Sequence, residues 1–101
     1  MEPDLHLVKR MTTGDDVAAE ELFRRHSSSV YAMVYAILQD PEAADAVVTA
    51  TFRYAHRVSG QFHQARGTVF SWLSTIARGQ ATSFETARQS ITWRHPFRAP
   101  D

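Results

Sequence analysis

Apolar residues recur along this chain in steps of three, four and seven, the spacing that gathers them on one side of an α-helix. The pattern predicts a short first helix from Asp4 to Met11, followed by a break at residues 12–14. A long second helix follows, with Thr13 or Asp15 as the residue that caps its N-terminus. The apolar stripe predicted for this helix comprises Leu22, Phe23, Val30, Met33, Val34, Ile37 and Leu38.

The sequence Asp40-Pro41-Glu42 predicts the start of a third helix, because Asp is a preferred cap, Pro suits the first turn and Glu favours the helix dipole. Gly60 suits the left-handed conformation that ends many helices, which predicts that this helix ends at residues 59–60. The apolar face predicted for it comprises Val47, Val48, Thr51, Phe52, Ala55 and Val58.

A polar loop over residues 61–67 separates the third helix from a last one, which begins at Thr68 and extends to about Gln89. No stretch alternates between apolar and polar residues for long enough to form a strand. We therefore predict an all-α bundle of three main helices and a short N-terminal helix over residues 1–90, with an irregular tail at 91–101. The apolar residues of the last helix are Val69, Phe70, Leu73, Ile76, Ala77, Ala81 and Phe84.

The composition is typical of one folded domain: 101 residues, of which 44% are hydrophobic and 22% charged. The absence of cysteine excludes disulfides and thiolate metal sites, so a reducing cytoplasm is the expected location. No apolar run approaches the roughly 20 residues of a membrane span, and the N-terminus lacks the basic flank and apolar stretch of a signal peptide. We therefore predict a cytoplasmic protein without membrane contact.

The net charge of zero conceals two halves of opposite charge. Residues 1–52 hold four basic residues against nine acidic ones, a net −5, and residues 53–101 hold seven arginines against two acids, a net +5. Arginine suits phosphate recognition and stacking on bases. The distribution therefore favours one face that binds a polyanion and another for a different partner, the alternative being chance polarity of a solvated surface.

The segment from Phe62 to Arg78 combines a basic, polar loop with the aromatic start of the last helix. Exposed rings and positive charges are the groups that bind single-stranded nucleic acid. Trp72 lies in this segment, but at least one ring of the helix start must join the core, which favours a buried Trp72. The residues predicted to contact nucleic acid are Arg57, Phe62, His63, Arg66, Arg78 and Arg88.

The sequence carries no recognisable pattern for catalysis or metal binding. The five histidines form no His-Glu-x-x-His motif, and the serines that follow His26 stand in no Gly-x-Ser-x-Gly elbow. A small helical domain also has little room for a deep substrate pocket. We therefore predict a binding protein without enzymatic activity, metal or other cofactor.

Several short motifs stand in a fixed order between Leu5 and about Arg88. They are Gly14-Asp15-Asp16, Ala18-Ala19-Glu20-Glu21-Leu22-Phe23-Arg24-Arg25-His26, Val30-Tyr31, Asp40-Pro41-Glu42-Ala43-Ala44, Phe52, Phe62, Gly67, Phe70-Ser71-Trp72-Leu73 and Ile76-Ala77-Arg78. In this order and spacing they resemble the second conserved region of bacterial RNA polymerase sigma factors of the extracytoplasmic-function group. The resemblance implies a transcription-initiation domain that binds core RNA polymerase and melts promoter DNA.

In this family the helix after the Asp-Pro turn packs against the coiled-coil clamp of the largest polymerase subunit. The family's usual Asp, Gln and acidic residue are replaced by Ala46, Thr49 and Ala50 in this sequence. Each lost hydrogen bond to a charged group costs about 1.5–3 kcal/mol, so polymerase binding is expected to be weaker unless other contacts compensate. The residues that the resemblance assigns to this partner surface are Asp45, Val48, Thr49, Ala50, Phe52 and Arg53.

The resemblance also implies that the last helix and the preceding loop read the promoter minus-ten element and hold a flipped base. The family's Asn, Asp and Arg in this helix are replaced by Gly79, Ser83 and Thr86. We expect their loss to weaken base discrimination and to leave backbone attraction and stacking, which tolerate many sequences. The helix-turn-helix domain that follows in such sigma factors, region 4, does not occur in this sequence.

These replacements leave two functional readings open. In the first, the chain binds core RNA polymerase and promoter DNA in transcription initiation. In the second, it is a sigma-like protein-interaction module that binds an anti-sigma factor or another regulator through its third helix, without promoter recognition. The basic half and its loop favour the first, and the replaced polar residues favour the second.

Overall fold

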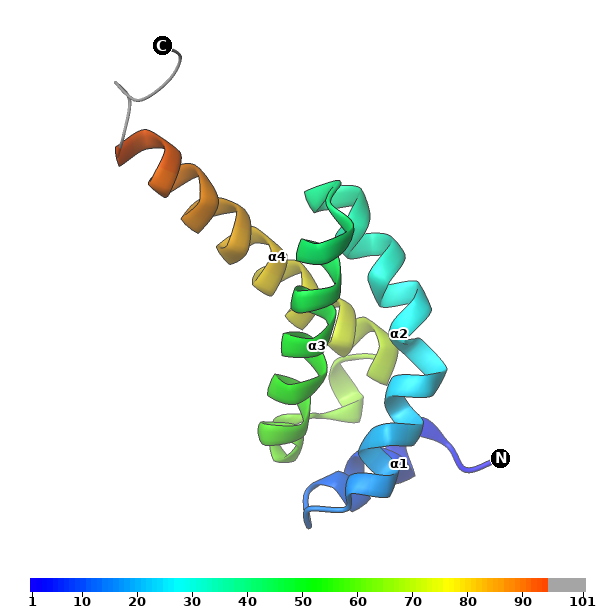
Figure 1. Cartoon of the computed structure of the whole chain (residues 1–101). Helices are drawn as coiled ribbons and strands as arrows, with labels where there is room; N and C mark the ends of the chain where they lie inside the picture. The colour runs from blue at the N-terminus through cyan, green and yellow to red at the C-terminus, as the bar shows by residue number, and fades with distance from the viewer. Residues whose placement is uncertain (95–101) are drawn as a thin grey trace.

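The computed structural model describes residues 1–94, with side-chain surroundings for residues 1–89, and this part of the chain contains no strand. Figure 1 shows α2 and α3 as an antiparallel pair, α4 crossing this pair, and α1 at the lower end. The predicted all-α bundle of three main helices and a short N-terminal one is confirmed. The elements are α1 (Asp4–Met11), α2 (Asp16–Leu38), α3 (Pro41–Arg57), the single 3₁₀ turns η1 (Ser59–Gln61) and η2 (Gln64–Arg66), and α4 (Val69–Arg94).

Acidic and hydroxyl side chains cap the helices where the sequence predicts them. The Asp15 carboxylate accepts hydrogen bonds from the first-turn N–H groups of α2, at 3.0 and 3.1 Å, so Asp15 and not Thr13 is the cap. Asp40 does the same for α3, ahead of Pro41, at 3.0 and 3.3 Å. The Thr68 hydroxyl accepts from the Ser71 N–H at 3.0 Å, which fixes the start of α4.

The end of α3 differs from the prediction. Gly60 does not adopt a left-handed conformation, because the chain continues from α3 directly into the 3₁₀ turn η1. The positive φ angle of this loop belongs instead to Gly67, at 134°. The positive φ favours glycine at this position, and a Cβ atom there would lie 2.8 Å from the Ser71 hydroxyl oxygen, so a larger residue would also have to displace that hydroxyl.

Two apolar clusters form the core of the described chain. The upper cluster joins α2, α3 and α4 through Val30, Val34, Leu38, Ala43, Ala44, Val47, Val48, Ala77 and Ala81. The lower cluster joins α1 to the other helices through Leu7, Val8, Met11, Ala18, Leu22, Ala55, Val69 and Leu73. Phe52 is half-buried and packs against both clusters.

The predicted apolar faces are wider than the faces that the structure buries. In α2, Phe23 and Ile37 remain about 40% exposed, at 41% and 40%. Its buried residues Leu22, Val30, Val34 and Leu38 follow steps of four and eight, which leaves Phe23 and Ile37 at the edge of the stripe. In α4, Phe70 is likewise exposed.

The prediction of an irregular tail at residues 91–101 is wrong for its first four residues. Residues 91–94 form the last turn of α4, and residues 95–101 lie outside the described part of the chain. The domain boundary at residue 90 stays a prediction.

Candidate nucleic-acid and partner interfaces

A hollow of about 300 Å³ opens where the loop meets the start of α4. The loop folds over it through η1, an extended residue at His63, η2 and the positive φ angle of Gly67. We call this hollow the loop pocket. Its lining residues are Gln61, Phe62, His63, Arg66, Gly67, Thr68, Ser71, Trp72 and Thr75.

Phe62 and Trp72 form the aromatic wall of the loop pocket. Their ring centroids lie 5.2 Å apart with a tilt of 58°, and both half-buried side chains pack on the lower cluster. The sequence favoured a core position for Trp72, and the structure gives this ring both a core contact and a place in the pocket wall. His63 and Arg66 are exposed and add polar and positive groups to the rim.

The other three residues predicted to contact nucleic acid lie elsewhere. Arg57 is exposed at the end of α3, with its guanidinium 5.3 Å from the centre of the Tyr54 ring. Arg78 is exposed on α4 and contacts the sulfur of Met33 on α2 at 3.7 Å. Arg88 pairs with an acid of its own helix and, at 3.7 Å, with Asp40, so its charge is partly compensated.

A second hollow, of about 480 Å³, lies between α2 and α3. Its apolar floor includes Phe23 and Phe52, whose rings meet edge to face with centroids 5.0 Å apart. We call it the α2–α3 groove. Its lining residues are Ala19, Glu20, Phe23, Thr49, Phe52, Arg53, His56 and Arg57.

The residues predicted for the partner surface divide by burial. Asp45, Thr49 and Arg53 are exposed, and Ala50 and Phe52 are half-buried. Val48 is only 5% exposed and belongs to the upper cluster, so it supports the surface from below and does not form part of it.

Sequence reasoning missed three features of these two hollows. Phe23 was assigned to the core, although its exposed edge lies in the α2–α3 groove. The polar residues Ser71 and Thr75 were not singled out, although they line the loop pocket beside Trp72. Their spacing of four along α4 is the signal that could have found them, because residues so spaced share one side of a helix.

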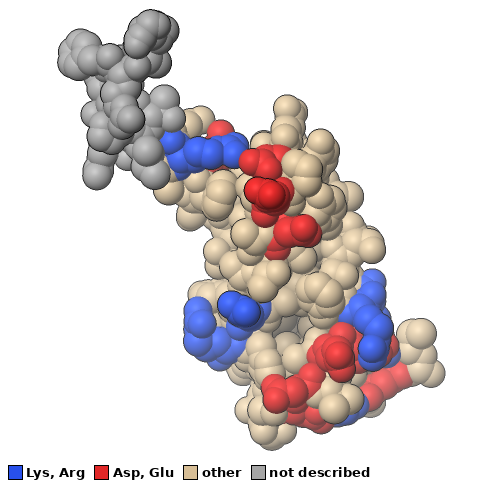
Figure 2. Space-filling view, viewed as in Figure 1, with Lys and Arg blue, Asp and Glu red and all other residues tan. Residues whose placement is uncertain are grey.

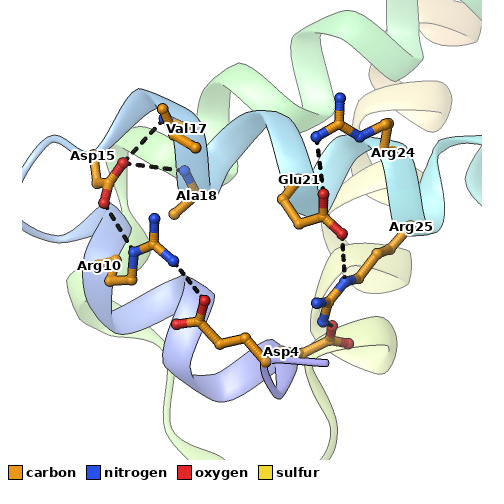
Figure 3. Close-up of polar contacts among 9 residues, drawn as sticks. Asp4, Arg10, Asp15, Val17, Ala18, Glu21, Arg24 and Arg25 are labelled. Carbon is orange, nitrogen blue, oxygen red and sulfur yellow. Dashed lines mark hydrogen bonds and ion pairs between the residues drawn. The ribbon is translucent and has the colours of Figure 1, made fainter.

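Ion pairs at the N-terminal end join α1 to α2 (Figure 3). The Asp4 carboxylate accepts a hydrogen bond from Arg25 at 2.9 Å and lies 2.7 Å from the His26 ring nitrogen Nε2. Arg25 also pairs with Glu21 at 3.1 Å, and Arg24 with the same carboxylate at 2.9 Å. Burial alone would raise the pKa of Asp4, but hydrogen bonds from His26 and Arg25 outweigh it and lower that pKa.

A second set of ion pairs closes the turn between the two helices. Arg10 pairs with Glu2 and, at 2.9 Å, with Asp15. The hydrogen bonds from Arg10 and from the Ala18 N–H lower the pKa of Asp15. Because Arg10, Arg24 and Arg25 are all paired within the chain, these cations are poorly placed to bind an outside polyanion.

The described residues show no group of three or more histidine or acidic side chains arranged to hold a metal ion. Among them, no helix combines the length and the apolar character needed to cross a membrane.

Comparison with known proteins identifies the family. The sequence pattern of sigma-70 region 2 matches residues 22–90. This chain belongs to the sigma-70 region 2 family. The match spans most of α2, from Leu22 to its end, all of α3, the loop pocket and most of α4, which confirms the resemblance drawn from the motifs.

Relatives of this region 2 domain carry the description "ECF RNA polymerase sigma factor SigK". Those from Mycobacterium bovis (strain BCG / Pasteur 1173P2) and Mycobacterium tuberculosis (strain CDC 1551 / Oshkosh) are 30% identical to it over 79 residues. The aligned part covers 77% of this chain and 42% of each relative, so the chain spans less than half of their length. No solved structure gives a significant match.

Proposed function

We propose that this region 2 domain acts in transcription initiation, binding core RNA polymerase through α3 and promoter minus-ten DNA through the loop pocket. The observation that carries the proposal is the meeting of Phe62, His63, Arg66 and Trp72 at one hollow beside the start of α4. Its family membership supports the same role, since the relatives are described as RNA polymerase sigma factors. The domain works by binding and needs no catalytic group or cofactor.

The loop pocket suits an unpaired base of the nontemplate strand. An extruded base can stack on the exposed parts of the Phe62 and Trp72 rings, and each base–aromatic stack is worth about 1–3 kcal/mol. Arg66 supplies a cation for a neighbouring phosphate, and the hydroxyls of Thr68 and Ser71 offer polar groups to the base edge. Because Gly79 and Ser83 lack the donors and acceptors of the family, we expect weak discrimination between bases.

The exposed side of α3 suits the clamp of the largest polymerase subunit. Asp45, Thr49 and Arg53 project from this side, and Ala50 borders it. The α2–α3 groove beside them exposes part of Phe23, which gives a partner apolar area next to the charges.

A protein-interaction role is the second candidate, and the side chains at the centre of α3 favour it. Ala46 and Thr49 are exposed and Ala50 is half-exposed, so the family's polar contacts with polymerase are absent from the surface itself. An anti-sigma factor or another regulator with an apolar helix would suit such a surface better than the clamp does.

Fluorescence anisotropy with a labelled single-stranded minus-ten oligonucleotide tests the DNA-binding part. Phe62→Ala is expected to weaken binding about tenfold or more, because a stack of 1–3 kcal/mol is lost. Arg66→Ala should weaken binding and reduce its salt dependence by about one charge. The matched control is Lys9→Ala, which removes an exposed cation from α1 and should have little effect. Equal losses in all three variants would contradict a role for the loop pocket.

Interferometry with core RNA polymerase tests the polymerase-binding part of the proposal. Binding that an intact extracytoplasmic-function sigma factor displaces, and that Arg53→Glu weakens, is the expected result. Failure of the folded domain to bind polymerase, together with capture of an anti-sigma factor, would favour the second candidate.

A further inference from the structure

α3 carries a stripe of charged residues on the side opposite the core. The residues that α3 buries are Ala43, Ala44, Val47, Val48, Thr51 and Ala55. On the other side, Glu42, Asp45, Thr49 and Arg53 are exposed and His56 is half-buried. Their spacing of three and four residues aligns them in one row along the helix.

The acidic and arginine side chains of this stripe have no partner among the residues whose side chains the structure describes. Within residues 1–89, the side chains of Glu42, Asp45 and Arg53 make no ion pair and no hydrogen bond, whereas Arg25 and Asp4 at the N-terminal end are fully engaged. Figure 2 shows acidic side chains over the N-terminal end of α3, basic ones over its C-terminal end, and uncharged surface between them. The stripe is therefore acidic at one end and basic at the other, and its charges are available to another molecule.

Acidic residues before Thr49 and basic residues after it lie at equal distances along the helix. Asp45 precedes Thr49 by four residues and Arg53 follows it by four, while Glu42 and His56 stand seven residues away on either side. At a rise of about 1.5 Å per residue these offsets are about 6 and 10 Å. Two α3 helices can therefore pack antiparallel about a two-fold axis that passes through Thr49. Each Asp45 then faces Arg53 of the other copy, and each Glu42 faces His56 of the other copy.

Acids near the start and bases near the end are favoured in any helix by its dipole, so the order alone carries little weight. The additional features here are the shared side, the equal offsets and the small centre formed by Ala46, Thr49 and Ala50. Small side chains at a crossing permit the 8–10 Å approach of two packed helices. The exposed edge of Phe23 in the neighbouring α2–α3 groove adds apolar area for a second molecule to cover.

We propose that α3 forms a symmetric homodimer interface, in which the stripe of one copy binds the stripe of another in antiparallel orientation. This dimer does not rest on the proposed function, because neither polymerase nor DNA takes part in it. It uses the side of α3 that we propose for the polymerase clamp. The two complexes therefore exclude each other, and pairing of two copies holds the domain in a form that does not bind polymerase.

Sedimentation velocity of the full 101-residue chain at a series of concentrations tests the proposal. The expected result is a reversible monomer–dimer equilibrium that weakens as salt is added, since exposed charges are screened. Asp45→Arg or Arg53→Asp alone should raise the dimer dissociation constant about tenfold or more, because two attractive pairs become repulsive. Lys9→Glu, an exposed reversal on α1, is the matched control and should change nothing.

A mixture of the two single variants sharpens the test. In a heterodimer of Asp45→Arg with Arg53→Asp, both central pairs regain opposite charges, so the mixture should dimerise more tightly than either variant does alone. Thr49→Arg places two cations on the axis and should abolish the dimer. Circular dichroism should show unchanged helix content, because all three sites are exposed. A monomer at every concentration into the millimolar range, or no recovery in the mixture, would overturn the proposal.

Discussion

The N-terminal end of this domain and the exposed side of α3 use charge in opposite ways. At the N-terminal end, Arg10 and Arg25 each pair with two acids, and these pairs hold α1 against the start of α2. Along α3, Asp45 and Arg53 are without ion-pair partners among the described residues. Paired charges of this kind stabilise the fold, and unpaired ones remain available to another molecule.

The two regions also differ in what lies beneath them. The lower cluster joins α1 to the start of α4, and the rings of Phe62 and Trp72 rest on it. α3 rests mainly on the upper cluster, through small residues such as Ala43 and Ala44. The loop pocket therefore depends on the same packing that holds the N-terminal end, while most of α3 rests on the upper cluster.

The largest expected effect comes from removing that shared packing. Leu73 is fully buried in the lower cluster, so Leu73→Ala should lower the free energy of unfolding by about 2–5 kcal/mol. Urea unfolding followed by circular dichroism measures this. The control Phe70→Ala removes a larger but exposed side chain from the same helix and should cost much less. Similar losses from both variants would show that the lower cluster is loosely packed.

The next effect is a gain in stability beneath the α3 surface. Thr51 is fully buried, and its hydroxyl oxygen has no hydrogen-bond partner within the described residues. Thr51→Val replaces the hydroxyl by a methyl group of similar size and should raise the free energy of unfolding by about 1–3 kcal/mol. Thr49→Val, two residues earlier in α3 but exposed, should change it by no more than about 0.5 kcal/mol. A Thr51→Val variant that is less stable would reveal a polar role for this hydroxyl.

A smaller effect tests the comparison of charges directly. Arg25→Ala should lower the melting temperature by a few degrees, because it leaves Asp4 without a main partner and opens the contact between α1 and α2. Arg53→Ala should leave the melting temperature unchanged. Thermal unfolding of both variants at low and high salt measures the difference. Equal shifts would mean that the Arg25 pairs add nothing to the fold.

Much of the fold follows from local signals in the sequence. Asp15 and Asp40 cap their helices through contacts with residues two and three positions away, so a short window of sequence contains the whole cause. Gly60 failed as a helix-ending signal because the next turn, η1, continues from α3 without a change in the sign of φ. Whether the helix ends at a left-handed glycine or continues into a 3₁₀ turn depends on how the loop packs, and a short window of sequence does not predict that packing.

The candidate site was predictable only in its loop. Phe62, His63 and Arg66 are close in sequence and line one pocket, as the basic, aromatic loop suggests. Arg88 looks equally basic in the sequence, yet it faces Asp40 across the packing of α4 on α3. The exposed edge of Phe23 likewise depends on how far α3 covers α2. Contacts between helices decide these cases, and helix periodicity alone does not predict them.

The smallest effect concerns pH and the carboxylate of Asp4. Its pKa is lowered in the folded chain, since hydrogen bonds from His26 and Arg25 outweigh the cost of burial, so folding favours the ionised form. The resulting stabilisation is fully present above the pKa of the unfolded chain, about 3.9, and is lost as the pH falls through the lower folded value. The melting temperature of Asp4→Asn should therefore lie below that of the unmodified chain at pH 7, and the gap should narrow as the pH falls below about 3.9 and through the lowered folded pKa of Asp4.

Asp45→Asn is the matched control, because this exposed acid has no partner within the described residues and its loss should change the melting temperature little. A gap for Asp4→Asn that persists at low pH would mean that the side chain stabilises the fold through packing and not through its charge. A gap for Asp45→Asn as large as that for Asp4→Asn would remove the distinction between the two regions. In that case the unpaired acids of α3 would contribute to folding and would not be freely available to a second copy or to polymerase.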